Sequence, residues 1–96
     1  MLVVISYDVN TGDTAGRRRL RRIAKLCMDW GQRVQFSVFE CLVDYSQWLK
    51  LRHSLLAEMD TEKDSLRFYL LGNRWQQRVE HVGAKASYDP EGALIF

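Results

Sequence analysis

The sequence predicts a small α+β domain in which two helices cover one face of an antiparallel sheet. Three observations favour this class. The chain has 96 residues, room for one core; its apolar segments follow the order strand–helix–strand–helix–strand; and its hydrophobic fraction is 47% with a single proline. This composition excludes a disordered chain, and no apolar run reaches the roughly 18–20 residues of a membrane span. Since Met1–Ile5 is also too short for a signal peptide, we expect a cytoplasmic protein with no membrane partner.

The first strand and the first helix have clear sequence limits. Leu2–Asp8 begins with four apolar residues, as in a strand covered on both sides. After a turn-rich loop, Asp13 or Thr14 is expected to cap a helix that runs to about Trp30. Gly31 is placed where a left-handed C-cap is common. The predicted buried stripe consists of Leu20, Ile23, Ala24, Cys27 and Trp30.

The remaining elements follow from composition. Arg33–Val43 has strand composition and fits one bent strand or two short strands, although no Gly, Pro or Asn marks a reversal. A second amphipathic helix is predicted from about Ser46 to Met59, then a strand over Ser65–Leu71 and a short further strand over Gln77–Val82. The side chains of the second helix that we expect to face inward are Trp48, Leu51, Leu55, Leu56 and Met59.

The sheet predicted from this order has an unprotected apolar face. Leu66, Phe68 and Leu70 alternate with Tyr69 and Leu71, so both sides of that strand carry apolar groups. A domain of this size rarely exposes such a surface to water. We therefore predict a homodimer that packs through the sheet, with the apolar tail Ala93–Phe96 adding to a strand edge.

The cysteines and histidines form no recognisable catalytic or metal-binding motif. Cys27 and Cys41 fit neither a disulfide framework nor a zinc knuckle, and are predicted to be small buried side chains. His53 and His81 are predicted to lie at the surface, which we favour over a two-histidine nuclease.

Asp8 is the candidate metal ligand. It ends the most hydrophobic strand, and an anionic oxygen ligand in such a position suits a hard cation such as Mg²⁺. A single carboxylate makes a poor site, but a twofold axis would supply a second Asp8. The structural alternative is an Asx-type turn in which the side chain caps the following loop.

Basic residues are concentrated on the first predicted helix. Six of the seven basic residues in positions 1–43 lie between Arg17 and Lys25, and no acidic residue falls between Asp13 and Asp29. Such self-repulsion favours contact with a nucleic-acid backbone over a merely solvated face. Arg33, Ser37, Phe39 and Arg67 could extend this region, although Phe36 and Phe39 are better explained as core or interface residues than as base platforms. The candidate nucleic-acid-binding residues are Arg17, Arg18, Arg19, Arg21, Arg22 and Lys25.

Four segments together resemble one known family. They are Tyr7-Asp8-Val9, the Arg-rich run 16–22, Gly31–Cys41 with its RVQFSVFE core, and Asp64–Leu70. These segments resemble the CRISPR-associated "Cas two" endoribonuclease family over nearly the whole chain. The ending from Gly83 to Phe96 looks like the branch found in subtype I-C loci.

The resemblance implies a ferredoxin-like βαββαβ sandwich spanning residues 1–96 as one domain, so Arg33–Val43 should contain two strands. It also implies a homodimer in which an additional C-terminal strand, from the tail at about 83–96, joins the partner's sheet.

The resemblance further implies a Mg²⁺-dependent phosphodiesterase, with Mn²⁺ as an alternative, that cleaves RNA or DNA and acts in spacer acquisition beside the CRISPR-associated integrase. In some relatives the cleavage is dispensable. Asp8 matches the family's metal-binding aspartate. The candidate catalytic residues are Asp8, Tyr7, Arg33, Ser37 and Phe39. Tyr7, Arg33 and Phe39, with Arg17 and Arg19 on the helix, match positions that affect cleavage in relatives, and Ser37 matches the motif's serine.

Three alternatives belong to other functional classes. A non-catalytic dimeric scaffold would bridge integrase subunits and support DNA with the same basic helix. A toxin-like mRNA interferase would share the fold. A plain RNA-recognition domain is the weakest alternative, because the sequence lacks its aromatic pattern.

Overall fold

The computed structural model describes residues 1–83 and confirms the predicted α+β class. The elements are β1 (Leu2–Asp8), α1 (Thr14–Trp30), β2 (Gly31–Gln35), β3 (Val38–Leu42), α2 (Tyr45–Glu58), β4 (Ser65–Gly72) and the 3₁₀ helix η1 (Trp75–Gln77). The predicted tail strand at about 83–96 lies almost wholly outside the described residues.

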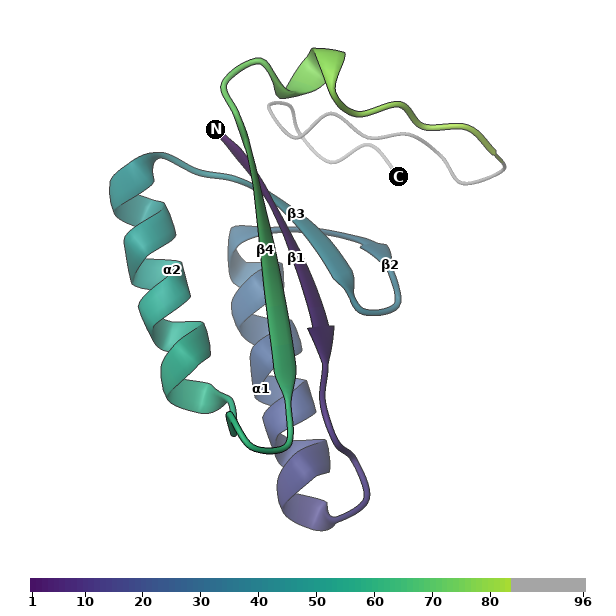
Figure 1. Ribbon diagram of the computed structural model, residues 1–96, viewed down its shortest axis with the longest axis vertical. Coiled ribbons are helices and arrows are strands. Elements are labelled where there is room, and N and C mark those ends of the chain that lie inside the picture. The colour runs from purple at the N-terminus through teal and green to yellow at the C-terminus, as the bar shows by residue number, and fades with distance from the viewer. Residues whose placement is uncertain (84–96) are drawn as a thin grey trace.

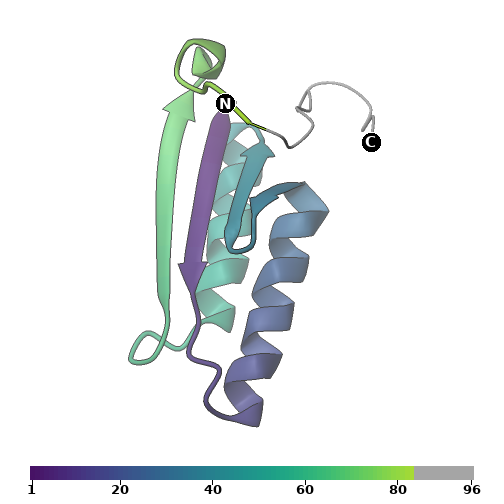
Figure 2. The same ribbon diagram turned by 90° about the vertical axis from the view of Figure 1, so that its right-hand side faces the viewer.

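The strands form one antiparallel sheet in the order β2-β3-β1-β4, so β1 is central and β2 and β4 are the edges. Both helices lie on one side of this sheet (Figures 1 and 2). The element order βαββαβ and this strand order make the fold ferredoxin-like, as the resemblance implied. No helix in the part of the chain that the structure describes is long and apolar enough to cross a membrane.

The hydrophobic core lies between the helices and the covered face of the sheet. Val3, Ile5 and Tyr7 alternate along β1 and are buried there, because successive strand residues point to opposite faces. The Trp48 ring of α2 meets the Phe68 ring of β4 edge to face, with centroids 4.8 Å apart. The other residues of this core are Val9, Ile23, Cys27, Phe39, Cys41, Val43, Leu51 and Leu55.

The helix starts follow from their caps. Asp13 caps α1, where its Oδ1 accepts the Gly16 N–H at 2.7 Å. Asp44 and Gln47 form a reciprocal capping box at the start of α2. The second helix thus begins one residue earlier than predicted, and Leu56, expected to face inward, is 38% exposed because it lies one position beyond the buried Leu55.

Gly31 does not form the left-handed cap that the sequence predicted. Its φ of −165° is extended, and it begins β2 directly after α1. A Cβ at this position would collide with the Glu40 carbonyl oxygen and with Cys41 on the paired strand. Glycine is therefore required here by the close approach of two strands.

Arg33–Val43 contains two strands rather than one bent strand. The reversal falls at Phe36 and Ser37, and the Tyr7 N–H donates to the Ser37 carbonyl oxygen at 3.1 Å, which ties the turn to β1. The short strand expected over Gln77–Val82 is wrong: the chain forms η1 and then irregular structure up to residue 83. Within η1 and its C-cap, local bonds such as that from the Arg78 N–H to the Trp75 carbonyl replace strand pairing.

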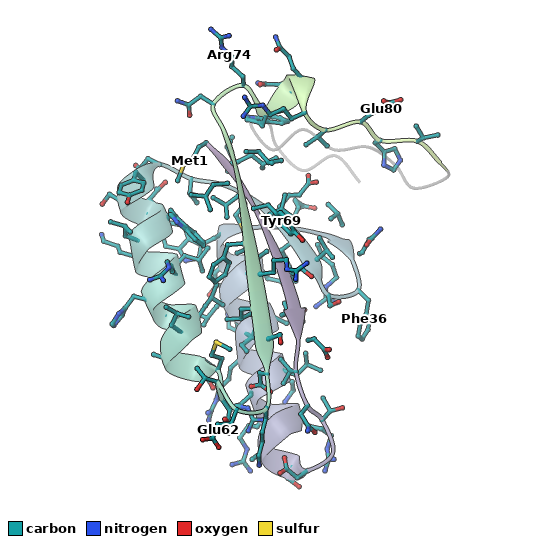
Figure 3. The ribbon with its side chains drawn as sticks, in the orientation of Figure 1. Met1, Phe36, Glu62, Tyr69, Arg74 and Glu80 are labelled. Atoms are coloured by element: carbon teal, nitrogen blue, oxygen red, sulfur yellow. The ribbon has the colours of Figure 1, made fainter. Side chains whose placement is uncertain are left out.

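The second face of the sheet carries no helix. Val4, Val38 and Leu42 on this uncovered face are half-buried, and Tyr69 is 44% exposed. Figure 3 shows the Tyr69 side chain over β4 on this side. The apolar surface that motivated the dimer prediction is thus present in the fold.

Candidate functional site

Asp8 is the last residue of β1 and lies on the uncovered face. Its side chain is exposed, whereas the side chains of Tyr7 and Val9, on either side of it in sequence, are buried. In the sheet, Asp8 pairs with Ser65, the first residue of β4. No hydrogen bond or ion pair within residues 1–83 engages the Asp8 carboxylate, so it is available to a ligand.

The Asp8 carboxylate is a type of ligand that Mg²⁺ prefers. Carboxylate oxygens are the preferred protein ligands of Mg²⁺, which usually binds one or two of them together with water and phosphate oxygens. Ser6 and Ser65 share the uncovered face with Asp8 and offer only neutral hydroxyl oxygens. Among the described residues, no group of three or more His, Cys, Asp or Glu side chains could hold a metal. The other ligands of an ion at Asp8 would therefore have to include water, phosphate oxygens or a group from another molecule.

Tyr7, Arg33, Phe36 and Phe39 form an aromatic–arginine cluster on the opposite, helix-covered side. The Tyr7 and Phe39 rings stack with centroids 6.1 Å apart. The Arg33 guanidinium carbon lies 5.1 Å from the Phe39 centroid and 6.0 Å from the Phe36 centroid. Phe39 is fully buried, whereas Phe36, at the tip of the β2–β3 hairpin, is 79% exposed (Figure 3).

Burial dominates the electrostatics of Tyr7. Desolvation raises the pKa of its phenol, and the neighbouring Arg33 offsets only part of this effect. The hydroxyl points to the Phe36 carbonyl oxygen at 3.4 Å. Tyr7 is therefore protonated at neutral pH and is no candidate for a general base.

The predicted catalytic residues thus fall on two sides of the sheet. The structure brings Tyr7, Arg33 and Phe39 together, and attaches Ser37 to Tyr7 through the backbone. It does not bring these side chains to Asp8, because adjacent strand residues project in opposite directions. The roles that the resemblance implied for the cluster remain a prediction.

Several of the α1 cations have acidic partners that are distant in sequence. Arg19 pairs with Asp64 and Arg22 with Glu58, while Lys25 pairs with Asp29 one turn along the helix. These partners relieve part of the repulsion expected from the sequence. The expectation was incomplete because it considered only acidic residues on the same helix.

The cations of α1 without an acidic partner among residues 1–83 are Arg17, Arg18 and Arg21. Arg17 donates to the Thr11 carbonyl at 3.4 Å and the Thr14 hydroxyl at 3.1 Å, both neutral acceptors. Within residues 1–83, no hydrogen bond or ion pair engages Arg18 or Arg21. At 100° per residue, these three side chains span about 100° of the helix surface. This exposed arc at the start of α1 is the candidate nucleic-acid surface, and it lies at the end of the domain where β1 finishes (Figure 1).

Arg19 differs from the other arginines because of its position on the helix. Relative to Arg17 it lies at about 200°, next to the buried Ile23 at about 240°. Its side chain is only 14% exposed and donates to both oxygens of Asp64. No local motif marks Asp64 as this partner, although the position of Arg19 beside the apolar stripe signals that this cation needs a buried carboxylate.

Arg67 is a further cation near this end of the sheet, as the sequence suggested. It lies on the uncovered face, paired with Ser6, two residues along β4 from the partner of Asp8. Its guanidinium donates to the Tyr69 hydroxyl at 3.3 Å, which helps to raise the pKa of Arg67.

The cysteines and histidines lie where the sequence placed them. Cys27 and Cys41 are buried free thiols, and burial raises the pKa of each to about 12, so neither is a thiolate near neutral pH. His53 and His81 are exposed.

The chain is similar to known proteins over its whole length. Residues 1–79 match the family "CRISPR associated protein Cas2". A "CRISPR-associated endoribonuclease Cas2" of Nitratidesulfovibrio vulgaris is 70% identical, covering 100% of this chain and 94% of that protein. A "CRISPR-associated endonuclease Cas2" of Halalkalibacterium halodurans is 55% identical and fully covered.

A solved structure supports the same assignment. Streptococcus pyogenes Cas2, crystallised at pH 6.5, superposes with a TM-score of 0.74 at 55% identity, covering 86% of this chain and 100% of that one. The fold, the family match and the identity of the relatives agree, and the chain belongs to the CRISPR-associated Cas2 family.

Proposed function

We propose that this protein is a homodimeric, Mg²⁺-dependent endonuclease that acts with the CRISPR-associated integrase in spacer acquisition. The observation that carries the proposal is the exposed, unengaged carboxylate of Asp8 at the end of the central strand. The relatives support a cleavage reaction, since they are named endoribonuclease in one case and endonuclease in the other. The substrate is accordingly a phosphodiester of RNA or DNA.

The dimer follows from the uncovered face of the sheet. Val4, Val38 and Leu42 are half-buried there in the isolated chain, and a second copy packed on this face would bury them fully. A twofold axis through the same face would also bring a second Asp8 towards the first. The dimer and the complete metal site therefore depend on one interface.

Different residues of the chain would bind the metal, bind the nucleic-acid backbone and support the site. The two Asp8 carboxylates would bind Mg²⁺, or Mn²⁺ in its place, on either side of the twofold axis. A divalent ion held there would supply Lewis-acid chemistry, activating a water and offsetting the charge of the phosphate. Arg17, Arg18 and Arg21 would bind the backbone at the adjacent end of α1. Tyr7, Arg33, Ser37 and Phe39 would support the strand end that carries Asp8.

The test is a panel of labelled RNA and DNA substrates, single and double stranded, with the wild type and Asp8→Asn. We expect the wild type to cleave at least one substrate with Mg²⁺ and to lose this activity in EDTA. Asp8→Asn should lower cleavage more than about 100-fold, because losing a ligand costs at least as much as losing an outer-shell partner. Equal turnover by Asp8→Asn would remove Asp8 from the reaction.

A second candidate function is a non-catalytic scaffold. It is favoured because no group of three or more possible metal ligands gathers among residues 1–83, and because Tyr7 and Phe39 are buried on the side of the sheet opposite Asp8. In this case Asp8→Asn would preserve spacer acquisition in cells, whereas charge reversal at Arg18 and Arg21 would abolish it. Loss of acquisition in Asp8→Asn would favour the nuclease.

A further inference from the structure

Asp64 is a buried carboxylate that accepts four hydrogen bonds. Its side chain is 0% exposed. Oδ1 accepts the Asn10 N–H at 3.1 Å and an Arg19 NH2 group at 3.3 Å. Oδ2 accepts the Arg19 Nε–H at 2.8 Å and the Asp60 N–H at 3.0 Å. A buried charge with all its acceptor positions used is a built feature of the fold, because an unpaired one would be strongly destabilising.

The four bonds join segments that are far apart in sequence. Asn10 lies two residues after Asp8, Arg19 is on α1, and Asp60 is in the loop after α2. Asp64 directly precedes β4, whose first residue, Ser65, pairs with Asp8. The Asp64 carboxylate thus fixes the chain just beyond Asp8 and the strand beside it.

On the other side of Asp8, the backbone is fixed by a separate bond. The Tyr7 N–H donates to the Ser37 carbonyl in the β2–β3 turn. Asp8 is therefore held by its backbone between two anchors, while its own side chain makes no hydrogen bond or ion pair within residues 1–83. Only the anchor at Asp64 uses side chains, so it is the one that substitution can remove.

We infer that Asp64, held by Arg19, is a positioning residue that sets the place of the Asp8 carboxylate, and that Arg19 does not contact the nucleic acid. The inference about Asp8 rests on the proposed function. The inference about Arg19 rests on its geometry alone. Its Nε–H and one NH2 group already donate to a carboxylate in the two-pronged arrangement with which arginine binds phosphate.

A salt titration tests the role of Arg19 without any need for cleavage. Binding of a labelled oligonucleotide in EDTA is measured by fluorescence anisotropy across a range of salt concentrations. Arg18→Gln, the matched control, should reduce the slope of log K against log salt by about one unit, as expected for a lost phosphate contact. Arg19→Gln, and the charge-balanced double variant Arg19→Gln/Asp64→Asn, should keep the wild-type slope. A reduction in the double variant equal to that of Arg18→Gln would overturn the inference.

Amide hydrogen exchange tests the anchor directly. Asp64→Asn replaces one acceptor oxygen by an NH2 group that faces hydrogen-bond donors. Arg19→Lys keeps the positive charge but loses the two parallel hydrogen bonds of the guanidinium. Both variants should speed exchange of the Asn10 and Asp60 amides at least about tenfold. Glu58→Gln breaks the more exposed Arg22 pair between the same helices and should leave both amides unchanged. Unchanged exchange in Asp64→Asn would contradict the anchor.

Kinetics then separate positioning from mere stability. At a temperature where all variants are folded by circular dichroism, Asp64→Asn and Arg19→Lys should lower kcat by about tenfold or more, with KM within twofold of the wild type. Glu58→Gln should retain the wild-type kcat. A wild-type kcat in both variants, or a raised KM as the main effect, would overturn the positioning role. If Asp8→Asn cleaved like the wild type, the proposed function would fail, and the salt slope and amide exchange would still decide the roles of Arg19 and Asp64.

Discussion

The two sides of the sheet at the end of β1 have opposite physical characters. On the covered side, Tyr7 stacks on Phe39, and Arg33 lies over the same ring. On the uncovered side, Asp8 is exposed and engaged by no group in residues 1–83. Two consecutive residues thus serve the core and a surface site. This difference shows why a motif such as Tyr7-Asp8 does not identify two residues with the same role.

The largest effect on stability should come from a substitution on the covered side of the sheet. Phe39→Ala removes a fully buried ring, and we expect the free energy of unfolding in urea to fall by about 3–5 kcal/mol. Phe36→Ala is the matched control, because that ring is exposed at the hairpin tip; it should change stability by no more than about 0.5 kcal/mol. Similar losses in both variants would contradict the division between the two rings.

The second-largest effect should be a loss of stability in acid, when the Asp64 carboxylate is protonated. Burial raises the pKa of Asp64, but hydrogen bonds from Arg19 and from the Asp60 and Asn10 amides outweigh burial, so the folded pKa is lowered. The unfolded chain then binds more protons, and the stabilisation is present above the unfolded pKa of about 3.9 and is lost as pH falls through the folded pKa.

Urea unfolding between about pH 2.5 and pH 6 measures this effect. A single group can contribute a slope of up to about 1.4 kcal/mol per pH unit. Asp64→Asn should show a shallower fall than the wild type, while the capping residue Asp13, whose pKa is lowered chiefly by the Gly16 amide, titrates in both proteins. Identical acid profiles would mean that Asp64 does not contribute.

The smallest effect is expected at the Tyr7 hydroxyl. Tyr7→Phe keeps the stacked ring and removes a long hydrogen bond of 3.4 Å, so it should cost no more than about 1 kcal/mol of stability. Because the hydroxyl lies on the side opposite Asp8, cleavage should stay within about threefold of the wild type in initial-rate assays. A loss comparable to that of Asp8→Asn would give Tyr7 a direct part in the reaction.

The sequence predicted the elements whose patterns are local. The limits of β1 and α1 were correct because four apolar residues and the Asp13 cap mark them. The hairpin was ambiguous because Phe36-Ser37 contains no Gly, Pro or Asn. The role of Gly31 was predicted wrongly because glycine is needed there by the closeness of Glu40 and Cys41 on another strand. Contacts between distant segments are not encoded in local periodicity.

Local sequence patterns likewise predicted only part of the candidate site. The position of Asp8 followed from its place at a strand end, and the exposed arginines followed from helical spacing. The pairing of Arg19 with Asp64 joins residues 45 positions apart, so it emerged only in the fold. The separation of Tyr7 from Asp8 could have been predicted from strand alternation alone.

The measurement that tests the account most directly is the stoichiometry of Mn²⁺ binding, because it does not depend on cleavage. Isothermal titration of the wild type, with the oligomeric state determined in parallel by analytical ultracentrifugation, should give one ion per two chains, and Asp8→Asn should remain dimeric and bind none. One ion per chain, or unchanged binding by Asp8→Asn, would contradict a site shared by two copies of Asp8.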